Sequence, residues 1–373
     1  MGKRLLSKKD PKRAADPGAD AVRPVPPRAL RGLVDWFGRK QRVLPWREEP
    51  TLYRVWISEI MLQQTQVATV LPYFERFMAT FPTVGALARA DEDAVMKAWA
   101  GLGYYSRARN LHAGAKAIVA RGREGFPRTK EGWLEIPGVG PYTAGAITSI
   151  ALGLPEPIVD GNVERVFARL RMLERSGSAG GGKNSGEAAY KAALWELSRS
   201  AVERAHADGL SPSDLNQAWM ELGATVCTPK NPTCKVCPIR RECAAFAAER
   251  VSDFPGKKKR AKTVEVTEER VALVDARAGK VYVERIAAGE WRAGMWDFPK
   301  VPPAGFRAAR GGDLGQIETN HVVTHHKITR RLSVLEGTIP GKAPGRWISL
   351  ADPEVALGSA PKLGIRRIRE RIG

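Results

Sequence analysis

Apolar residues recur at steps of three and four along residues 28–250, a spacing that places them on one face of an α-helix. Ile57, Ile60 and Met61 are one example. A Gly- and Ser-rich stretch at 176–188 interrupts the pattern and predicts a flexible loop between two helices. The pattern therefore predicts a region that is helical almost throughout.

The pattern changes at residues 254–263 (FPGKKKRAKT), a basic segment with Pro and Gly that we interpret as a linker. Short runs rich in β-branched residues follow at 271–276, 280–286 and 328–337. These runs predict a second, smaller α+β domain in the C-terminal part of the chain.

The stretch 134–163 predicts a tight turn between two helices. Pro141 stands at a first helical position and glycines precede it, as a helix-hairpin-helix requires. The backbone amides of Gly138, Val139 and Gly140 are then expected to point outward together and to cradle one phosphate oxygen.

Glu59 is a candidate general acid. On a helix, Glu59, Gln63 and Gln66 would share one face, while apolar neighbours turn toward a core. Poor solvation would raise the pKa of the Glu59 carboxyl, which suits a general acid. The alternative is an ordinary solvated glutamate.

Asp160 is the second candidate carboxylate. It follows an apolar run and precedes a helix, where Asp is a favoured N-cap worth ~1 kcal/mol. A capping Asp keeps one oxygen free, so the same carboxylate could stabilise a developing sugar cation. Asn162 could orient that carboxylate or a water molecule.

The segment 101–110 (GLGYYSRARN) combines apolar, aromatic and basic residues. Leu102 and Tyr104 could wedge between bases while Arg107 and Arg109 meet phosphates. A buried turn with solvated arginines is the alternative.

All cysteines of the chain lie within residues 227–243, which favours a metal or cluster site over disulfides. Their spacing, C-x6-C-x2-C-x5-C, contains one close pair rather than the two knuckles that are usual for structural zinc. A [4Fe–4S] cluster fits this spacing better, and zinc is the alternative. Lys230, between the first two cysteines, could touch a phosphate. The four candidate ligands are Cys227, Cys234, Cys237 and Cys243.

The chain has 373 residues and a formal net charge of +20. The length favours two domains, and this excess of positive charge favours a polyanionic partner, nucleic acid before membrane. No apolar run reaches the roughly 18 residues of a membrane span. The basic residues 1–27 lack the apolar core of a secretory signal and predict a disordered tail. We expect a monomer in the cytoplasm of a bacterium, associated with the nucleoid.

Several segments together resemble the helix-hairpin-helix DNA glycosylase superfamily, and more closely its adenine DNA glycosylases of the MutY type. The resemblance implies a mainly α catalytic region at 28–250, with a six-helix module and an iron–sulfur cluster module. It also implies a linker at 251–264 and a smaller α+β, Nudix-like domain at 265–373. The segments that carry it are LPWR (44–47), SEIMLQQTQV (58–67), GLGYYSRARNL (101–111), IPGVGPYTAGAI (136–147), VDGNVERV (159–166) and the cysteine quartet.

By this resemblance, Glu59 would protonate N7 of adenine and later activate water, while Asp160 would stabilise or transiently bond the oxocarbenium carbon. Tyr142 and Asn162 would support this geometry. Tyr142 stands where the lyase branch of the superfamily carries a Lys, and a phenol cannot form a Schiff base, so little or no lyase activity is expected.

The resemblance also implies an adenine pocket and a set of DNA contacts. Arg42, Trp46 and Arg47 would line the pocket, and Gln217 would contact the flipped adenine. Gln64 and Tyr104 would fill the base stack around the lesion, because such a base is reached only after extrusion from the duplex.

In the C-terminal part, WDFP (296–299) resembles a segment of the Nudix-like domain of these enzymes. The glutamates of a Nudix box do not follow it, so pyrophosphate hydrolysis is not expected. Val323, Thr324 and His325 stand where the family has a Phe-Ser-His segment that recognises 8-oxoguanine, so Thr324 and His325 are the candidate lesion contacts.

The implied function is the hydrolytic excision of adenine mispaired with 8-oxoguanine, or with guanine, from duplex DNA. A thymine-mismatch glycosylase is one alternative, because those enzymes also carry Tyr at the position of Tyr142. A non-catalytic iron–sulfur protein that binds DNA or senses redox state is the other.

Overall fold

The computed structural model describes residues 23–122, 125–175, 185–256, 262–287, 289–290, 292–339 and 343–372. Most of the predicted tail and of the predicted loop at 176–188 therefore lies outside the described residues. Helix α12 spans Ser185–Ala207, so residues 185–188 of that predicted loop are helical instead.

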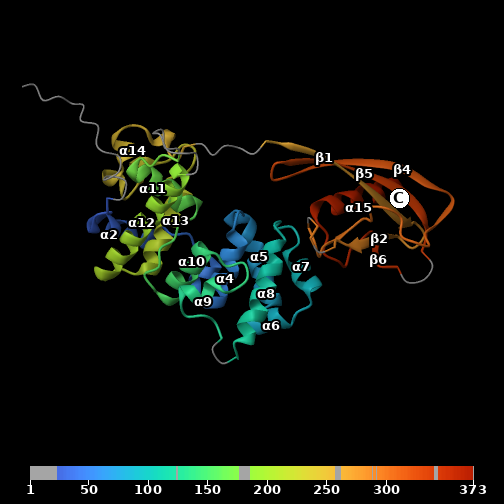
Figure 1. The fold of residues 1–373 in the computed structure, drawn as a ribbon, viewed down its shortest axis with the longest axis horizontal. Helices are drawn as coiled ribbons and strands as arrows, with labels where there is room; N and C mark the ends of the chain where they lie inside the picture. Colours follow the sequence, from blue (N-terminus) through green and yellow to red (C-terminus); the bar gives the residue numbers. More distant parts are fainter. Residues whose placement is uncertain are drawn as a thin grey trace, which may run out of the picture. The chain divides into compact units, whose positions relative to one another are not determined.

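The described residues before residue 250 are mainly helical, as the apolar spacing predicts (Figure 1). No helix among the described residues is both long and apolar enough to cross a membrane. Short 3-10 turns, η2 (Cys234–Val236), η3 (Arg240–Glu242) and η4 (Val251–Asp253), surround the cysteines. The helices are α2 (Pro27–Lys40), α3 (Pro45–Glu48), α4 (Leu52–Leu62), α5 (Val67–Thr80), α6 (Val84–Arg89), α7 (Glu92–Trp99), α8 (Ser106–Ala120), α9 (Lys130–Leu134), α10 (Pro141–Leu152), α11 (Gly161–Arg171), α12 (Ser185–Ala207), α13 (Pro212–Thr225) and α14 (Ala244–Ala247).

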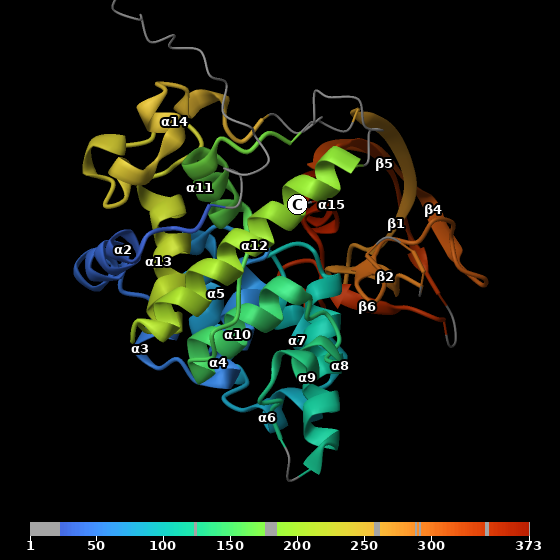
Figure 2. The same ribbon diagram turned by 60° about the vertical axis from the view of Figure 1, so that its left-hand side comes forward.

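Backbone contacts divide the chain into two compact units. The first unit contains α2, α3 and α9 to α14, and in it α13 packs against α2, α10 and α11 (Figure 2). The second unit contains α5 to α8 together with the C-terminal sheet. Helix α4 runs from the first unit into the second.

The predicted helical face that joins Glu59 to two glutamines is wrong. Helix α4 ends at Leu62, and Gln63 to Gln66 form a turn before α5 begins at Val67. The guanidinium of Arg107 terminates helix α4, because it donates to the carbonyl oxygens of Ile60, Met61 and Gln63 at 2.6–2.8 Å. Without Arg107, these carbonyl oxygens would need hydrogen bonds from the backbone amides of a further helical turn.

The C-terminal part of the chain contains a mixed sheet, so the predicted β-containing region is confirmed. Strand β1 runs parallel to β5, and the other pairings are antiparallel, in the order β3-β2-β1-β5-β4 with β6 paired to β2. The sequence patterns did not predict β3, β4, β6 or α15. The elements are β1 (Val264–Asp275), β2 (Lys280–Arg285), β3 (Trp296–Asp297), β4 (Arg307–Val323), β5 (His326–Thr338), β6 (Arg346–Ser349) and α15 (Ser359–Ile372).

Helix α15 covers one face of this sheet. Ile365 and Ile368 are buried in the same core as Phe298 and Leu332. A Cβ atom at Gly364 would lie 2.7 Å from the Phe298 ring and 2.8 Å from Leu332, so only glycine permits this close approach.

Candidate active site

Asp160 is the N-cap of helix α11, as predicted. Its Oδ1 accepts hydrogen bonds from the backbone amides of Asn162 (2.9 Å) and Val163 (2.7 Å). These amides would otherwise be unpaired at the helix start, and the positive end of the helix dipole also favours a carboxylate there. One oxygen of Asp160 is thus held by the helix itself.

The other oxygen of Asp160 is held by Asn162, whose Nδ2 donates to Oδ2 at 2.8 Å. Arg165 fixes the carboxamide in turn, because its Nη2 donates to Asn162 Oδ1 at 2.8 Å. Arg165 also donates to the carbonyl oxygens of Gly223 and Cys227, both at 2.7 Å. A continuous chain of hydrogen bonds therefore joins Asp160 to the backbone of the first cysteine.

The pKa of Asp160 is raised above its ordinary value. Burial is the largest cause, and the hydrogen bonds from Val163 and Asn162 and the charge of Arg165 offset part of it. A desolvated but hydrogen-bonded carboxylate interacts strongly with any positive charge that develops beside it.

Helices α11 and α13 approach closely at Asn162. A Cβ atom at Gly223 would lie 2.6 Å from the Cβ of Asn162 and 2.9 Å from its carbonyl oxygen. Gly223 thus permits the packing that holds Asn162 next to Asp160, and no sequence pattern had indicated it.

Two of the predicted pocket residues, Arg42 and Arg47, bind a carboxylate that the sequence patterns did not indicate. Glu221, whose side chain is fully buried, accepts from Arg42 Nε (2.7 Å) and Nη2 (2.9 Å) and from Arg47 Nη2 (2.9 Å). Arg47 Nε also donates to Gln217 Oε1 at 3.0 Å. Trp46, on α3 beside Arg47, is buried. The available signal was the position of Glu221, one helical turn after Gln217 on α13.

The pKa of Glu221 lies below its ordinary value despite its burial. Desolvation raises it, but the hydrogen bonds and charges of Arg42 and Arg47 outweigh that effect. The carboxylate is therefore ionised at neutral pH and holds both arginines in place. In this arrangement Gln217 accepts from Arg47 and donates from Nε2 to Ser213 Oγ at 3.2 Å, so its amide is oriented.

Tyr142 lies in the first turn of α10, directly after Pro141 at the helix start. Its hydroxyl donates to Met220 Sδ on α13 at 3.2 Å.

In the turn before α10, Gly138 has φ +80° and is exposed, while the Val139 side chain is buried. A Cβ at Gly138 would lie 2.7 Å from Asn110 Cβ, so this turn requires glycine.

The second unit holds further predicted residues. Glu59 is buried in α4, and Gln64 is exposed in the turn after it with φ +58°. Tyr104 is 43% exposed, whereas Leu102 is buried. Tyr104 is thus the residue of this loop that presents its ring to solvent.

Arg107 does not have the predicted phosphate-binding position. Its side chain is buried, and besides the α4 carbonyls it donates to the carbonyl oxygens of Leu102 and Gly103, both at 3.3 Å. Burial lowers its pKa to about 10, so it is still charged at neutral pH. Arg107 instead ties the 101–105 loop to the end of α4.

Thr324 and His325 form the two-residue turn between β4 and β5, because Val323 pairs with His326. Thr324 has φ +54° and is exposed, and its hydroxyl donates to the Val323 carbonyl at 2.7 Å. The His325 ring lies 4.1 Å from that of His326. The two candidate lesion contacts therefore occupy the tip of a hairpin.

The four cysteines line one pocket, together with Arg169, Arg240 and the apolar side chains of Val226, Phe246 and Val251. Arg169 Nη1 donates to Cys227 Sγ at 3.3 Å. No three His, Cys, Asp or Glu side chains in the described part of the chain are arranged around a single metal ion. Lys230 is exposed in the loop between the first two cysteines.

The comparisons with known proteins identify the family that this chain resembles. Residues 57–181 match the family described as HhH-GPD superfamily base excision DNA repair protein. The chain is 38% identical over 309 residues to an adenine DNA glycosylase of Arabidopsis thaliana, which covers 72% of this chain and 47% of that protein. Residues 57–181 of the chain therefore belong to the HhH-GPD superfamily.

Two further relatives also bear the name adenine DNA glycosylase. The protein of Rattus norvegicus is 44% identical over 238 residues, covering 61% of this chain and 44% of that one. The protein of Buchnera aphidicola subsp. Schizaphis graminum is 39% identical over 231 residues, covering 61% and 62%. The predicted resemblance is confirmed, and this HhH-GPD chain spans about half the length of these relatives.

Proposed function

We propose that this HhH-GPD chain is a monomeric DNA glycosylase that removes adenine mispaired with 8-oxoguanine, or with guanine, from duplex DNA. The observation that carries the proposal is the Asp160 carboxylate, which is fixed on both oxygens at the start of α11. The names of the relatives support adenine as the base.

The proposed reaction breaks the bond between C1′ and N9 of the adenine nucleotide. Glu59, buried in α4, transfers its proton to N7, and the bonding electrons leave with the base. Asp160 stabilises the positive charge that develops on the sugar. Water then adds to C1′ and its proton passes to the Glu59 carboxylate, which leaves adenine and an abasic site and restores the acid.

Tyr142 is proposed to limit the reaction to hydrolysis. A Schiff base requires a primary amine, and a phenol hydrogen-bonded to Met220 offers none. Without that covalent intermediate the DNA backbone is not cleaved by β-elimination.

The extruded adenine is proposed to bind beside Gln217, with Arg42, Trp46 and Arg47 around it. The buried Glu221 supports this assignment, because it fixes both guanidinium groups and through Arg47 the Gln217 amide. An amide of fixed orientation can discriminate between the donor and acceptor patterns of bases.

The DNA contacts are proposed to include several loops. Backbone amides at Gly138, Val139 and Gly140 would hold a phosphate, and Lys230 would hold another. The space in the base stack is proposed to be filled by Leu102, Tyr104 and Gln64. Tyr104, whose ring is exposed, would enter the stack first. Thr324 and His325, at the hairpin tip, are proposed to contact 8-oxoguanine.

We also propose that Cys227, Cys234, Cys237 and Cys243 hold a [4Fe–4S] cluster. All four line one pocket with no carboxylate or imidazole, a donor set that suits iron–sulfur ligation. Burial raises the pKa of Cys237 to about 12, so its proton must leave when a cation binds. Such a cluster supplies structural cross-linking and one-electron chemistry.

The proposal is tested with three duplexes that carry adenine opposite 8-oxoguanine, adenine opposite guanine and thymine opposite guanine. Alkali cleaves the backbone wherever a base has been removed. We expect cleavage at adenine in the first two duplexes, and Glu59→Gln should abolish it while DNA binding remains. Glu196→Gln, on the exposed side of α12, is the matched control. Removal of thymine alone would contradict the assignment.

The cluster is tested separately. Broad visible absorbance of the purified protein would support the cluster over zinc.

A further inference from the structure

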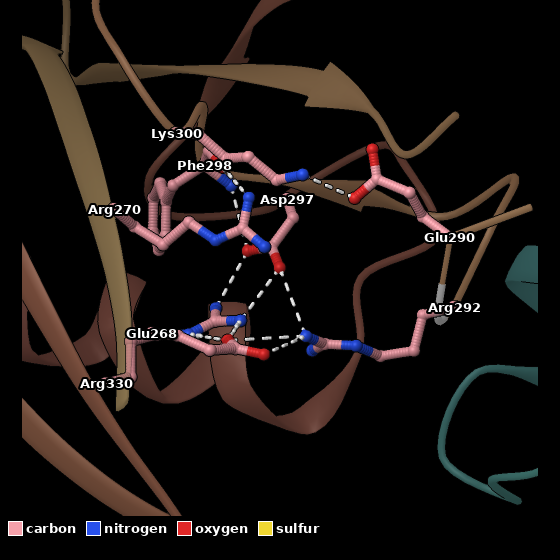
Figure 3. A network of polar contacts seen from close by, with 8 residues as sticks. All are labelled: Glu268, Arg270, Glu290, Arg292, Asp297, Phe298, Lys300 and Arg330. Carbon is pink, nitrogen blue, oxygen red and sulfur yellow. Dashed lines mark hydrogen bonds and ion pairs between the residues drawn. The ribbon is translucent and has the colours of Figure 1, made fainter. Parts of the chain in front are cut away.

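The sheet part of the chain contains a buried cluster of opposite charges (Figure 3). Arg330, on β5, is fully buried and donates to both carboxylate oxygens of Asp297 at 2.8 and 2.9 Å. Its Nε also donates to Glu268 Oε2, on β1, at 3.0 Å. Buried charges of this kind must stay paired, because an unpaired one is strongly destabilising.

Arg292 completes this cluster from outside the sheet. It belongs to the segment between β2 and β3, and its Nη2 lies 3.2 Å from Glu268 Oε1 and 3.7 Å from Asp297 Oδ2 (Figure 3). Arg292 and Arg330 thus share the two carboxylates, and the charge of Arg270 also acts on Glu268. Arg292 has φ +68°, an unfavourable backbone for a residue with a Cβ, so these contacts hold it in place.

The segment that carries Arg292 also contacts the helices of the same unit. Arg109, on α8, donates to the carbonyl oxygen of Ala293. A Cβ at Gly294 would lie 2.9 Å from Glu92 Oε1, on α7. Arg285 strengthens this contact from β2, with its Nη2 3.2 Å from Asp93 Oδ1.

The Arg292 segment is joined through Arg109 to the loop that presents Tyr104. The Arg109 side chain donates to the carbonyl oxygen of Ala293, and its backbone amide donates to the carbonyl oxygen of Tyr105 at 3.2 Å. Burial raises the pKa of Tyr105, and the charge of Arg292 offsets part of that rise. The Tyr105 hydroxyl accepts from the backbone amide of Gly101 at 3.3 Å, and Tyr105 directly follows Tyr104. The 101–105 loop is thus anchored beside the Arg292 segment.

The opposite end of this chain of contacts is the hairpin tip. Strand β5 begins at His326, directly after Thr324 and His325, and Arg330 lies on the same strand. A displacement of β5 at the tip would be transmitted to Glu268 and Asp297, and from them to Arg292. These links are the backbone of β5, the ion pairs of Glu268 and Asp297, and the hydrogen bond from Arg109 to Ala293, all within one structural unit.

We propose that Arg292 is a positioning residue that couples the Thr324–His325 hairpin tip to the 101–105 loop. Contact of the tip with the base opposite adenine then sets how firmly Tyr104 enters the base stack. This inference rests on the proposed function, because it explains how recognition of 8-oxoguanine at one site would accelerate base removal at another. Such coupling requires differential contacts at both ends, and the charge cluster connects them.

The test compares single-turnover excision of adenine opposite 8-oxoguanine with that opposite guanine. Arg292→Gln should lower the preference for 8-oxoguanine by about tenfold, within the range of coupling between sites, and leave the rate opposite guanine unchanged. Arg292→Lys keeps the charge and should restore most of the preference. Arg331→Gln, an exposed ion-pair partner on β5, is the control and should retain the full preference.

A second readout follows the wedge directly. With 2-aminopurine beside the lesion, wild-type protein should increase fluorescence as the stack opens, and Arg292→Gln should slow that increase. Equal loss of rate on both duplexes, or an unchanged preference with an unchanged fluorescence response, would overturn the inference. If the wild-type protein removes no adenine, the proposed function fails, and the fluorescence response alone decides the coupling.

Discussion

The carboxamide of Asn162 donates from Nδ2 to Oδ2 of Asp160 at 2.8 Å, two residues away in the same helix start. With the backbone bonds to Oδ1, it holds the carboxylate in one orientation. Asn162 is held in turn by Arg165 and by the close packing of Gly223. The hydrogen bond therefore belongs to the packing of α11 against α13.

Asn162→Ala should move the acid limb of the pH–rate profile to higher pH. Asp160 must be ionised to stabilise a cation, so activity falls as pH falls through its raised pKa. The side-chain hydrogen bond of Asn162 lowers that pKa, so its loss raises the pKa further. The measurement is the single-turnover rate across pH. Asn320→Ala, an exposed asparagine on β4, should leave the profile unchanged. If the acid limb of the pH–rate profile is the same in Asn162→Ala and wild type, Asp160 does not control that limb.

Glu221→Gln should destabilise the protein by about 3 kcal/mol, because two arginines lose a buried counter-charge. Thermal or urea unfolding measures the loss, and Glu196→Gln, an exposed pair, should cost under about 1 kcal/mol.

The stabilising effect of Glu221 should also depend on pH. Its folded pKa is depressed, so its contribution is present above its unfolded pKa, near 4.3, and is lost as pH falls through the folded value. The difference between wild type and Glu221→Gln should therefore shrink toward acid pH. A difference that stays constant with pH would argue against the ion pairs as its source.

Tyr142→Lys should introduce lyase activity. An amine at the first turn of α10 can attack the sugar carbon, so borohydride should trap a covalent complex with DNA. Tyr142→Phe removes the hydroxyl that donates to Met220 and adds no amine, so it should yield no trapped complex. Trapping with the wild-type protein would refute the role given to Tyr142.

Gly138→Ala should weaken DNA binding, and Gly140→Ala should not. A side chain at Gly138 must adopt φ +80° and meets Asn110 Cβ at 2.7 Å, which distorts the turn at a cost of about 1–3 kcal/mol. Gly140 has φ −100° with no atom within 4 Å of its Cβ position. Fluorescence anisotropy with undamaged duplex measures the effect, and equal affinities for the two variants would exclude a special requirement at Gly138.

Local patterns predicted what depends on neighbours in sequence. The Pro141 helix start, the Asp160 cap and the apolar helical spacing follow from residues within one or two turns of each other. The prediction failed where a distant residue intervened. Arg107 ends helix α4 at Leu62, although the local pattern continued through Gln66.

The sequence by itself determined the helical region, the capped Asp160, the tyrosine in place of a lysine and the four grouped cysteines, because these depend on residue type and short-range spacing. Only the tertiary structure decided that Glu221 holds Arg42 and Arg47, and that Arg292 joins the charge cluster of the sheet to the helices. These ion pairs join residues far apart in the chain. Their partners become neighbours only when folding removes them from water, where an unpaired charge would be too costly.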